Sequence, residues 1–545
     1  MAGYERIRSD EGSQQRGSPG PRRSSGNSSP RVSWDQDAPT PGRVCLLQQS
    51  NEEDFGRRAA ATTTGTAEGE RRQAHGEIDH HRTEQPVAGE AGRRRLVTTA
   101  LVYGASVLER ADEQILPSAY LFIGRSLFVS PTELGALTFA RALVQALSSP
   151  ISGILGDRYD RTWVIAFGCS VWGIMTAMFG FVTTLSMAMV LSAANGFGLS
   201  LVIPCCQSMI ADYYPAKDRG KAFGMLFMVS ILGGLCGGLL ATNLGGKILF
   251  GIEGWRVVYQ LVGLVSVLAG VLVFYFASDP RPTLHNGARG QNGNLWSEAI
   301  AIFKLRTFQV IIAQGIVGSM PWYCMGYFTL WFQLLGFNDF QASLLMAVFQ
   351  IGNAKGSFLG GWLGDVAAKW SPDHGRILVA QVSVFSGLPI IYFLLKILPP
   401  LAGVSFGPYF VLLWAMGMLV SWCATSCNNP VFADVVPEHL RSMIYAYDRC
   451  LEGGIAAMIT PLVGVLAEQT FKYRKPDPLH PMSREEGLHN ADALGNALVV
   501  TCTVPWLLCF LFYGLLHRVY AGDRSHAAAA ALKRGQRGAE SAGNA

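Results

Sequence analysis

Between Leu96 and Leu516 the chain is a succession of long apolar segments separated by short polar joints. A helix needs about 20 apolar residues to cross the hydrocarbon core of a bilayer, and its backbone polar groups must bond to one another there. Hydrophobic residues make up 50% of the chain and charged residues only 15%, against about 25% charged in soluble domains. The sequence therefore predicts an all-α, multi-pass membrane protein with twelve transmembrane helices. The predicted spans are roughly 97–122, 132–155, 162–183, 185–210, 220–246, 255–277, 307–335, 340–363, 377–396, 405–432, 442–467 and 493–516.

Polar segments flank this apolar region and divide it. Residues 1–95 are rich in Arg, Ser, Gly and acidic residues and cannot bury a core, so we expect a disordered N-terminal tail. The longest internal polar joint leaves six spans on each side. The predicted organisation is a tail (1–95), an N-terminal six-helix bundle (96–277), a linker (278–304), a C-terminal six-helix bundle (305–516) and a basic tail (517–545).

Two joints of the chain echo each other across the two halves. Asp212, Pro215 and Arg219 recur, with the same spacing, as Asp434, Pro437 and Arg441. Each copy closes one apolar segment and opens the next. Two similar halves can open alternately on either side of a bilayer around a central site, which predicts two pseudo-symmetric bundles and a transport function.

Lys and Arg residues indicate the orientation. Most of them lie in the two flanking segments and in the joints on the same side of the bilayer, which include Arg158, Arg161 and Lys221. Because such residues collect on the cytoplasmic side, we expect both termini to be cytoplasmic. The net charge of +5 then belongs to the bilayer surface and does not indicate nucleic acid. The sequence leaves open whether the bilayer is the plasma membrane or an internal membrane.

The joint between the second and third spans carries a specific motif. It reads Gly153-Ile-Leu-Gly-Asp157-Arg158-Tyr-Asp-Arg161 and resembles the signature loop of the major facilitator superfamily, although Asp160 replaces a usual glycine. The resemblance implies that the aspartate and arginines hold the inward ends of neighbouring helices together when the protein is open outward. It extends to the second half and the echoed joints, so the implied gate residues are Gly153, Asp157, Arg158, Arg161, Asp365, Asp212, Arg219, Asp434 and Arg441.

Two further patterns narrow the resemblance. Gly156–Arg161, together with an acid–arginine pair inside the first span, is similar to the spinster-like branch, and Leu108–Pro117 and Tyr445–Arg449 are most similar to its plant and algal members. Animal members of that branch export lysophospholipids or sphingoid lipids, whereas the plant-like members imply no particular substrate. In the fifth span Gly224, Gly233 and Gly237 resemble part of an antiporter motif, but small residues at this spacing also simply allow close helix packing.

Ionisable residues lie well inside several predicted spans. A charged side chain at the centre of a bilayer costs on the order of 3 kcal/mol or more, so it usually faces a cavity or a partner. These residues are Glu109, Arg110, Asp112 and Glu113 in span one, Arg141 in span two, Lys355 in span eight, and Asp448, Arg449 and Glu452 in span eleven. The interiors of spans three, six, nine and twelve, which the resemblance implies to be an outer scaffold, have none.

The charges of the first span predict a proton site. On a helix Glu109, Asp112 and Glu113 share one face, whereas Arg110 projects about 100° away. Neighbouring acids repel one another, which favours a bound proton on one of them. Our hypothesis is that Glu109 or Asp112 binds the coupling proton and that Arg110 is its switchable partner or an anion contact. The alternative is a static network with pairs such as Arg110–Asp448 or Lys355–Glu452.

Polar and aromatic residues in other spans complete the candidate site. Each could line a central cavity, and each could equally pack between helices: Asn195, Gln207, Gln314, Trp322, Gln350, Asn353, Trp422 and Asn428. Arg141 and Lys355 could attract an anionic head group.

Motifs of other function classes are absent from the sequence. It has no P-loop and no zinc-protease or nucleophile-elbow motif in a suitable context, and its 11 cysteines lack metal-ligand spacing. We therefore expect no enzyme activity, cofactor or metal. The predicted function is secondary active, proton-coupled transport of a small organic or amphipathic, lipid-like solute. The scaffold by itself leaves uniport, symport and antiport open, because all three use it. The alternatives are a transporter-like receptor or scaffold that binds a ligand without turnover, and an uncoupled lipid scramblase.

Overall fold

The computed structural model describes residues 88–214, 216–281, 303–435, 441–475 and 482–543. All of them belong to one compact unit, Gln85–Ala545. The expected disordered tail lies outside the described residues up to residue 87, and so does the linker between residues 282 and 302. Two predicted boundaries differ from the structure. The first helix begins at Ala88, and the last helix continues to Gly543 through most of the segment predicted as a tail.

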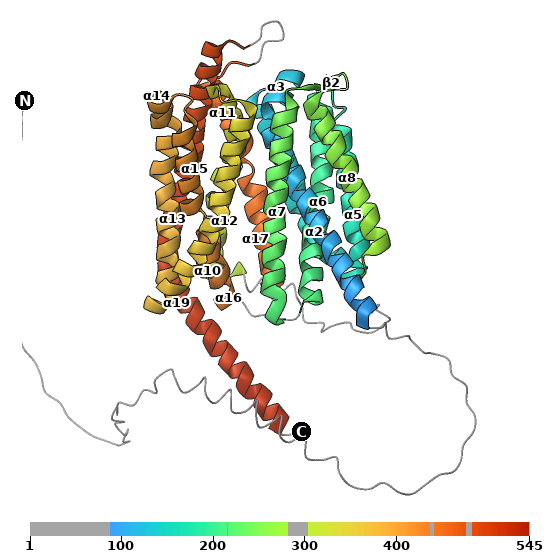
Figure 1. The fold of residues 1–545 in the computed structure, drawn as a ribbon. Helices are drawn as coiled ribbons and strands as arrows, with labels where there is room; N and C mark the ends of the chain where they lie inside the picture. Colours follow the sequence, from blue (N-terminus) through green and yellow to red (C-terminus); the bar gives the residue numbers. More distant parts are fainter. Residues whose placement is uncertain (1–87, 215, 282–302, 436–440, 476–481, 544–545) are drawn as a thin grey trace, which may run out of the picture. The chain divides into compact units, whose positions relative to one another are not determined.

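The first half of the chain forms six membrane-spanning segments (Figure 1). In order they are α2 (Ala88–Ser118) with α3 (Tyr120–Leu127), then α4 (Pro131–Arg158), α5 (Arg161–Phe179), α6 (Leu185–Tyr213), α7 (Ala216–Gly245) and α8 (Gly254–Phe276). A two-stranded antiparallel hairpin, β1 (Ile248–Leu249) and β2 (Ile252–Glu253), joins the last two helices.

Short polar motifs fix where these helices begin. Ser130 and Glu133 form a capping box at the start of α4, because each side chain bonds to the other residue's backbone N–H. Asp160 caps α5 by accepting from the backbone N–H of Thr162 at 2.8 Å and from its hydroxyl at 2.6 Å. Asp160, which replaces a usual glycine of the motif, is therefore a helix cap.

The second half also forms six spans, but with more interruptions. They are α10 (Arg306–Cys324), η1 (Met325–Tyr327) and α11 (Phe328–Leu335); α12 (Asp339–Trp370); α13 (Gly375–Tyr392), η2 (Phe393–Ile397) and α14 (Leu398–Ala402); α15 (Phe406–Val420), η3 (Ala424–Asn428) and α16 (Asn429–Val435); α17 (Arg441–Ala456), α18 (Ile459–Val465) and η5 (Leu466–Thr470); and α19 (Arg484–Gly543). Here η1 is a 3-10 turn, whereas η2, η3 and η5 are π-helical turns.

The predicted all-α fold with twelve spans is confirmed, although the spans are not equally apolar. Within the described part of the chain, nine helices are individually long and apolar enough to cross a membrane. The other three spans are α2–α3, α10–α11 and α12. The first contains Glu109, Arg110, Asp112 and Glu113, and the third contains Lys355. The charged side chains of these two spans therefore depend on neighbours inside the protein.

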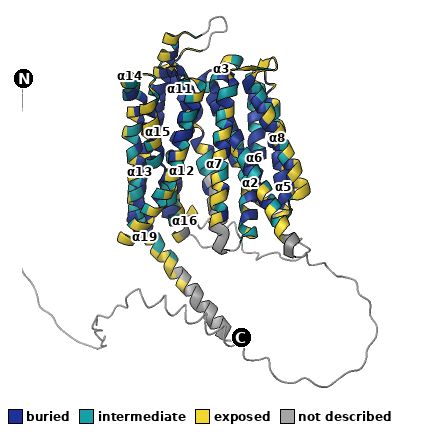
Figure 2. Ribbon diagram, viewed as in Figure 1, coloured by how far each residue is buried: buried dark blue, intermediate teal, exposed yellow. Residues whose placement is uncertain are grey.

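Each half packs largely within itself, and the halves meet mainly through α4 and α7 of the first half. In the first half α5 packs on α8 and α2 on α7; in the second, α10 packs on α19 and α12 on α15. Between the halves, α4 contacts α17 and α18, and α7 contacts α12. Figure 2 shows exposed residues along the outer faces of both halves. Large apolar side chains of α5 and α13, such as Trp163, Phe167 and Leu378, are exposed, as a lipid-facing surface requires.

The glycines of α7 form a contact face for α2. A Cβ atom at Gly233 would overlap the carbonyl oxygen of Val107, and one at Gly237 would overlap that of Ala111. A Cβ at Gly224, in contrast, would meet nothing within 4 Å. Two of the three glycines in the antiporter-like pattern therefore allow close approach of two backbones, as small residues do at membrane helix contacts.

We predict that Gly237→Leu destabilises the first half by about 1–3 kcal/mol, because the new side chain has to push α2 away. Gly224→Ala is the matched control on the same helix and is expected to leave stability unchanged or slightly raised. Thermal unfolding of the purified protein in one detergent measures both. Equal melting temperatures for Gly237→Leu and the control would contradict this account of the α2–α7 contact.

Candidate functional site

The two halves are joined by polar contacts at the end of the bundle where α3 and α11 lie, which we call the far end (Figure 1). The Tyr327 hydroxyl donates to the Pro131 carbonyl at 2.6 Å and lies 3.0 Å from the Thr460 carbonyl. The Thr460 hydroxyl in turn donates to the Gly135 carbonyl at 2.9 Å. Thr132 donates to Glu468 from its backbone and its hydroxyl, at 2.8 and 2.6 Å. Helices of both halves are thus bonded together at the far end.

Close backbone contact accompanies these bonds. A Cβ at Gly135 would overlap the Thr460 carbonyl and the Tyr327 hydroxyl, and a Cβ at Gly464 would overlap the backbone of Thr132. The rings of Tyr120 and Tyr327 pack with centroids 5.1 Å apart. The far end is therefore closed by tight packing as well as by hydrogen bonds.

At the opposite end, where α2 begins, the predicted gate arginine Arg161 is bound inside its own half. Its guanidinium forms ion pairs with Asp212 at 2.7 Å and with Asp279 at 2.6 Å, and it donates to Ser208 at 2.6 Å. Arg161 is only 1% exposed. The 2–3 joint, the end of α6 and the segment after α8 are consequently held together in one network.

Asp279 is the centre of this network. It also pairs with Arg281 at 2.8 Å, and Arg281 donates to the carbonyls of Gly156 and Tyr159 at 2.8 and 3.1 Å. Burial alone would raise the pKa of Asp279, but the hydrogen bonds from Arg161 and Arg281 lower it well below its usual value. Asp279 therefore stays charged.

The second half has a simpler counterpart. Arg376 pairs with Asp365 at 2.7 Å and donates to the Ser426 carbonyl at 3.2 Å. Asp434 accepts a hydrogen bond from the Tyr520 hydroxyl of α19 at 2.6 Å. These contacts also stay within one half.

The remaining gate residues contribute less to the described contacts. Arg158 is exposed and forms no ion pair with a residue that the structure describes. The backbones of Gly153, Asp157, Arg219 and Arg441 are helical, but their side chains lie outside the described part of the structure. Arg161, and not Arg158, is therefore the arginine that binds the neighbouring helices here.

The acids of α2 are distributed differently from the prediction. Glu109 and Asp112 are both 5% exposed, and Asp112 points into the first half and not between the halves. Arg110, predicted to project away from the acids, pairs with Glu113 one turn along its own helix. The proposed Arg110–Asp448 pair is wrong, because the long Arg side chain reaches back along the helix to a nearer acid.

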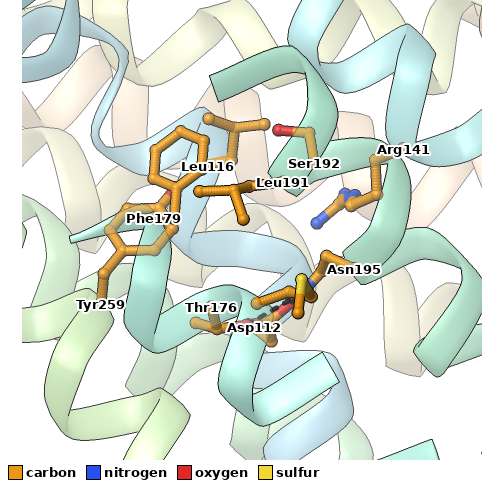
Figure 3. Close-up of a pocket in the computed structure, with 10 residues that line it drawn as sticks. Asp112, Leu116, Arg141, Thr176, Phe179, Leu191, Ser192, Asn195 and Tyr259 are labelled. Carbon is orange, nitrogen blue, oxygen red and sulfur yellow. Dashed lines mark hydrogen bonds between the residues drawn. The ribbon is translucent and has the colours of Figure 1, made fainter. Parts of the chain in front are cut away.

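Asp112 is held by two helices of the same half. Its Oδ1 accepts from the Thr176 hydroxyl at 2.5 Å, and its Oδ2 accepts from the Asn195 amide at 3.1 Å. The Asn195 amide also lies 2.9 Å from the Thr176 hydroxyl. Figure 3 shows Thr176 and Asn195 meeting Asp112 below the guanidinium of Arg141. Three helices thus supply a compact polar cluster in an apolar bundle.

Arg141 lies beside this cluster without an ion pair. Its two terminal nitrogens contact the Glu113 carbonyl at 3.4 Å each, and the side chain is 9% exposed. A buried arginine inside the first half is poorly placed to attract a head group between the halves. That expectation for Arg141 is therefore wrong.

The charged residues of the second half are placed less closely together. Lys355 is exposed on α12 and forms no ion pair with a described residue, so the proposed Lys355–Glu452 pair is wrong. The Glu452 carboxylate instead packs against Gly315 of α10, where a Cβ would overlap it. Asp448 is buried, and the side chain of Arg449 lies outside the described part of the structure.

The polar and aromatic candidates divide into buried and half-buried positions. Asn195 belongs to the Asp112 cluster, and Gln314 is buried in α10. Trp322 packs on Phe349 at a centroid distance of 6.0 Å. The half-buried side chains are Gln207, Gln350 and Asn353.

Two of these candidates are packing residues of the second half. Trp422, which follows α15, is buried, lies against Gly360 and donates to the Met418 carbonyl of α15. Asn428 accepts from the Tyr513 hydroxyl at 2.8 Å. These side chains are bonded inside the half, and a cavity-lining role for them stays a prediction.

Sequence reasoning missed four residues of these clusters. Thr176, and Tyr259, which lines the pocket beside Asp112, lie in spans without interior charges. A single hydroxyl in such a span carries no signal in one sequence. Asp279 and Arg281 follow the sixth span directly, and an acid and a base around a proline at that position could have been recognised.

Comparison with known proteins identifies the family. Residues 102–461 match the Major Facilitator Superfamily, which is well over half of the chain. This chain belongs to the major facilitator superfamily. The resemblance of its sequence motifs to that family is thereby confirmed.

Individual relatives are distant. A protein of Escherichia coli (strain K12) named "Probable L-galactonate transporter" is 26% identical over 181 residues, 33% of this chain and 39% of that protein. The quinolone resistance protein NorA of Staphylococcus aureus is 27% identical over 164 residues, 30% of this chain and 40% of that protein. The alignments thus span about two fifths of the length of these curated relatives.

Solved structures show the fold over most of the chain. A bacterial homologue of the human lysosomal transporter Spinster, in an inward-facing and unoccupied conformation, matches with a TM-score of 0.66 and 21% identity. The match covers 80% of this chain and 99% of the homologue. At this identity the likeness concerns the fold alone.

We predict that Asp279→Asn destabilises the protein at neutral pH by about 3–5 kcal/mol, because Arg161 keeps its charge but loses its buried partner. Because folding lowers the pKa of Asp279, its contribution is complete above the unfolded value of about 4 and is lost as the pH falls through the lower folded value. Thermal unfolding at pH 7 and at about pH 2 measures the effect. Arg158→Gln, at an exposed position, is the control. An Asp279→Asn variant as stable as this control would contradict the prediction.

Proposed function

We propose that this protein is a secondary active transporter of the spinster-like branch that moves a small organic or amphipathic solute by alternating access. One observation carries the proposal: in a chain of this family, the two halves are bonded together at the far end, whereas the gate residues at the other end are bonded within their halves. A transporter that rocks between two closures needs one end to be separable while the other is closed. Both termini face the cytoplasm in this proposal, because Lys and Arg gather at their end.

The energy source we propose is a proton gradient. Glu109 and Asp112 are buried acids in a membrane-spanning helix, and such residues commonly belong to proton relays. Asp112 is held by two neutral donors and no cation, so both its charged and its protonated form can be accommodated. Glu109 has no such donors in the structure, which makes Asp112 the stronger candidate.

Two cationic side chains support an anionic or amphipathic substrate. The side chain of Arg110 is 48% exposed, and Lys355 is exposed on α12. Both lie on spans that are more polar than the nine described helices whose composition suits a membrane crossing. Arg110 has a partner in Glu113 that a negatively charged group of the substrate could replace, whereas Lys355 could bind such a group directly.

The function is tested by reconstituting the protein in liposomes that contain a pH-sensitive dye. We expect wild-type protein to move protons when a suitable solute is added, with lysolipids as the first pool, and the Asp112→Asn variant to lose at least about tenfold of that flux, because it cannot bind the proton. Asp492→Asn, which removes an exposed ion pair with Lys396 away from the gate, is the control. Solute movement without proton movement would indicate an uncoupled carrier or scramblase, and binding without movement would indicate a receptor.

We also predict that Gly135→Ala shifts the protein away from the state that is closed at the far end, because the added methyl group overlaps Thr460 and Tyr327. Spin-labelled amino acids at the exposed positions Phe128 and Phe340 would report a longer distance between α3 and α12 in this variant. Gly104→Ala is the control, since its Cβ would meet nothing within 4 Å. An unchanged distance distribution would argue against rocking of the halves about this contact.

A further inference from the structure

A small cavity lies inside the first half, directly beside Asp112 (Figure 3). It has a volume of about 20 Å³, is open on one side, and is lined by side chains from α2, α4, α5, α6 and α8. Leu116, Phe179 and Leu191 supply its apolar wall. Its polar wall consists of Asp112, Arg141, Thr176, Ser192, Asn195 and Tyr259.

Three polar atoms of these lining residues have no hydrogen-bond partner in the protein. They are Nε of Arg141, Oδ1 of Asn195 and the hydroxyl of Tyr259. All three residues are more than nine-tenths buried, with exposed fractions of 9%, 6% and 6%. A buried polar group left unbonded costs about 1–3 kcal/mol, so three around one cavity require an explanation.

The three atoms are chemically complementary to one water molecule. Arg141 Nε–H can only donate, Asn195 Oδ1 can only accept, and the Tyr259 hydroxyl can do either. The Asn195 amide cannot be reversed, because its nitrogen already donates to Asp112 and lies against Thr176. A cavity of about 10–15 Å³ with two to four polar partners is enough to hold a water.

We propose that this cavity binds a single ordered water, which accepts from Arg141 and donates to Asn195 while bonding to Tyr259. The volume of about 20 Å³ matches a single water, and Arg141 is one of the groups that hold it. Tyr259 is then a positioning residue: it touches neither solute nor proton but holds the water beside Asp112.

The water gives Arg141 and Asp112 a connection that the protein groups do not supply. The two side chains line the same cavity without an ion pair, and a water between them makes a solvent-separated pair whose strength depends on the charge of Asp112. This part of the inference rests on the proposed proton coupling, whereas the presence of the water does not.

Arg141 lies on the helix that closes the far end. Thr132 and Gly135 of α4 contact the second half, and Arg141 follows Gly135 by less than two turns. A change in the attraction between Asp112 and Arg141 would therefore act on the helix that carries the closure.

Several other titratable groups surround this cavity. The helices packed on it contribute Glu109, Arg110, Glu113 and Tyr120 from α2 and α3, whereas the α5 and α6 lining is uncharged. Arg110 and Glu113 are paired with each other, and Tyr120 bonds to Thr138. Glu109 is the group whose titration must be separated from that of Asp112, so the functional test below is also made in a Glu109→Gln background.

The first experiment is a cryo-electron microscopy map of the full chain in lipid nanodiscs, at a resolution that shows other buried waters. We expect a density peak within hydrogen-bond distance of Arg141 Nε, Asn195 Oδ1 and the Tyr259 hydroxyl. Leu191→Phe, which fills the cavity, is expected to remove the peak. A wild-type map that shows buried waters elsewhere but none here would overturn the proposal, whatever the protein transports.

The second experiment measures the pH dependence of transport in Tyr259→Phe, with the exposed Tyr275→Phe of the same helix as the matched control. We expect the pH of half-maximal coupling to rise by about half to one unit in Tyr259→Phe, because a poorly held water solvates the Asp112 carboxylate less well. An unchanged profile would overturn the link to coupling. If Asp112→Asn itself keeps proton-coupled transport, the proposed function fails, while the map still decides the water site.

Discussion

Charged and polar groups inside a bilayer must find their partners within the protein, and the arrangement of this molecule follows from that requirement. The first half meets it by turning Asp112 inward, where Thr176 and Asn195 donate to it, and by placing Arg141 beside the Glu113 carbonyl. Every partner of Asp112 comes from the same six-helix bundle. The half can therefore move as one body without exposing its most costly group to lipid.

Close packing gives each half the rigidity that such a movement needs. The glycines of α7 bring two backbones into contact within the first half, and Gly198 does the same against Trp172 between α5 and α6. The same device closes the far end between the halves, where Gly135 and Gly464 meet the opposing backbone. A backbone contact at a glycine has a fixed geometry and few hydrogen bonds. The two helices can therefore form and release it as a unit.

The fold could be predicted from the sequence because its signals are long and repeated. Twelve apolar segments, a positive bias on one side and two echoed joints all point to the same architecture. The site was harder, because the direction of a side chain depends on a few degrees of helix rotation. Helix geometry placed Arg110 away from the acids, yet its long side chain bends back to Glu113. Thr176 and Tyr259 gave no signal because each is one hydroxyl in an apolar span, and its partner lies on another helix.

The two halves, similar in sequence motifs, differ in how they can deform. In the described part of the second half, π-helical turns interrupt the spans at η2, η3 and η5, and a 3-10 turn interrupts another at η1. Such interruptions leave backbone groups less tightly bonded and mark places where a helix can bend. The first half is instead tied by Arg161, Asp212 and Asp279 at one end and by the Asp112 cluster in its middle. Tyr327, which bonds to α4, belongs to the η1 turn itself. A rigid first half that holds the proposed proton site can thus act on a second half that bends where the two meet.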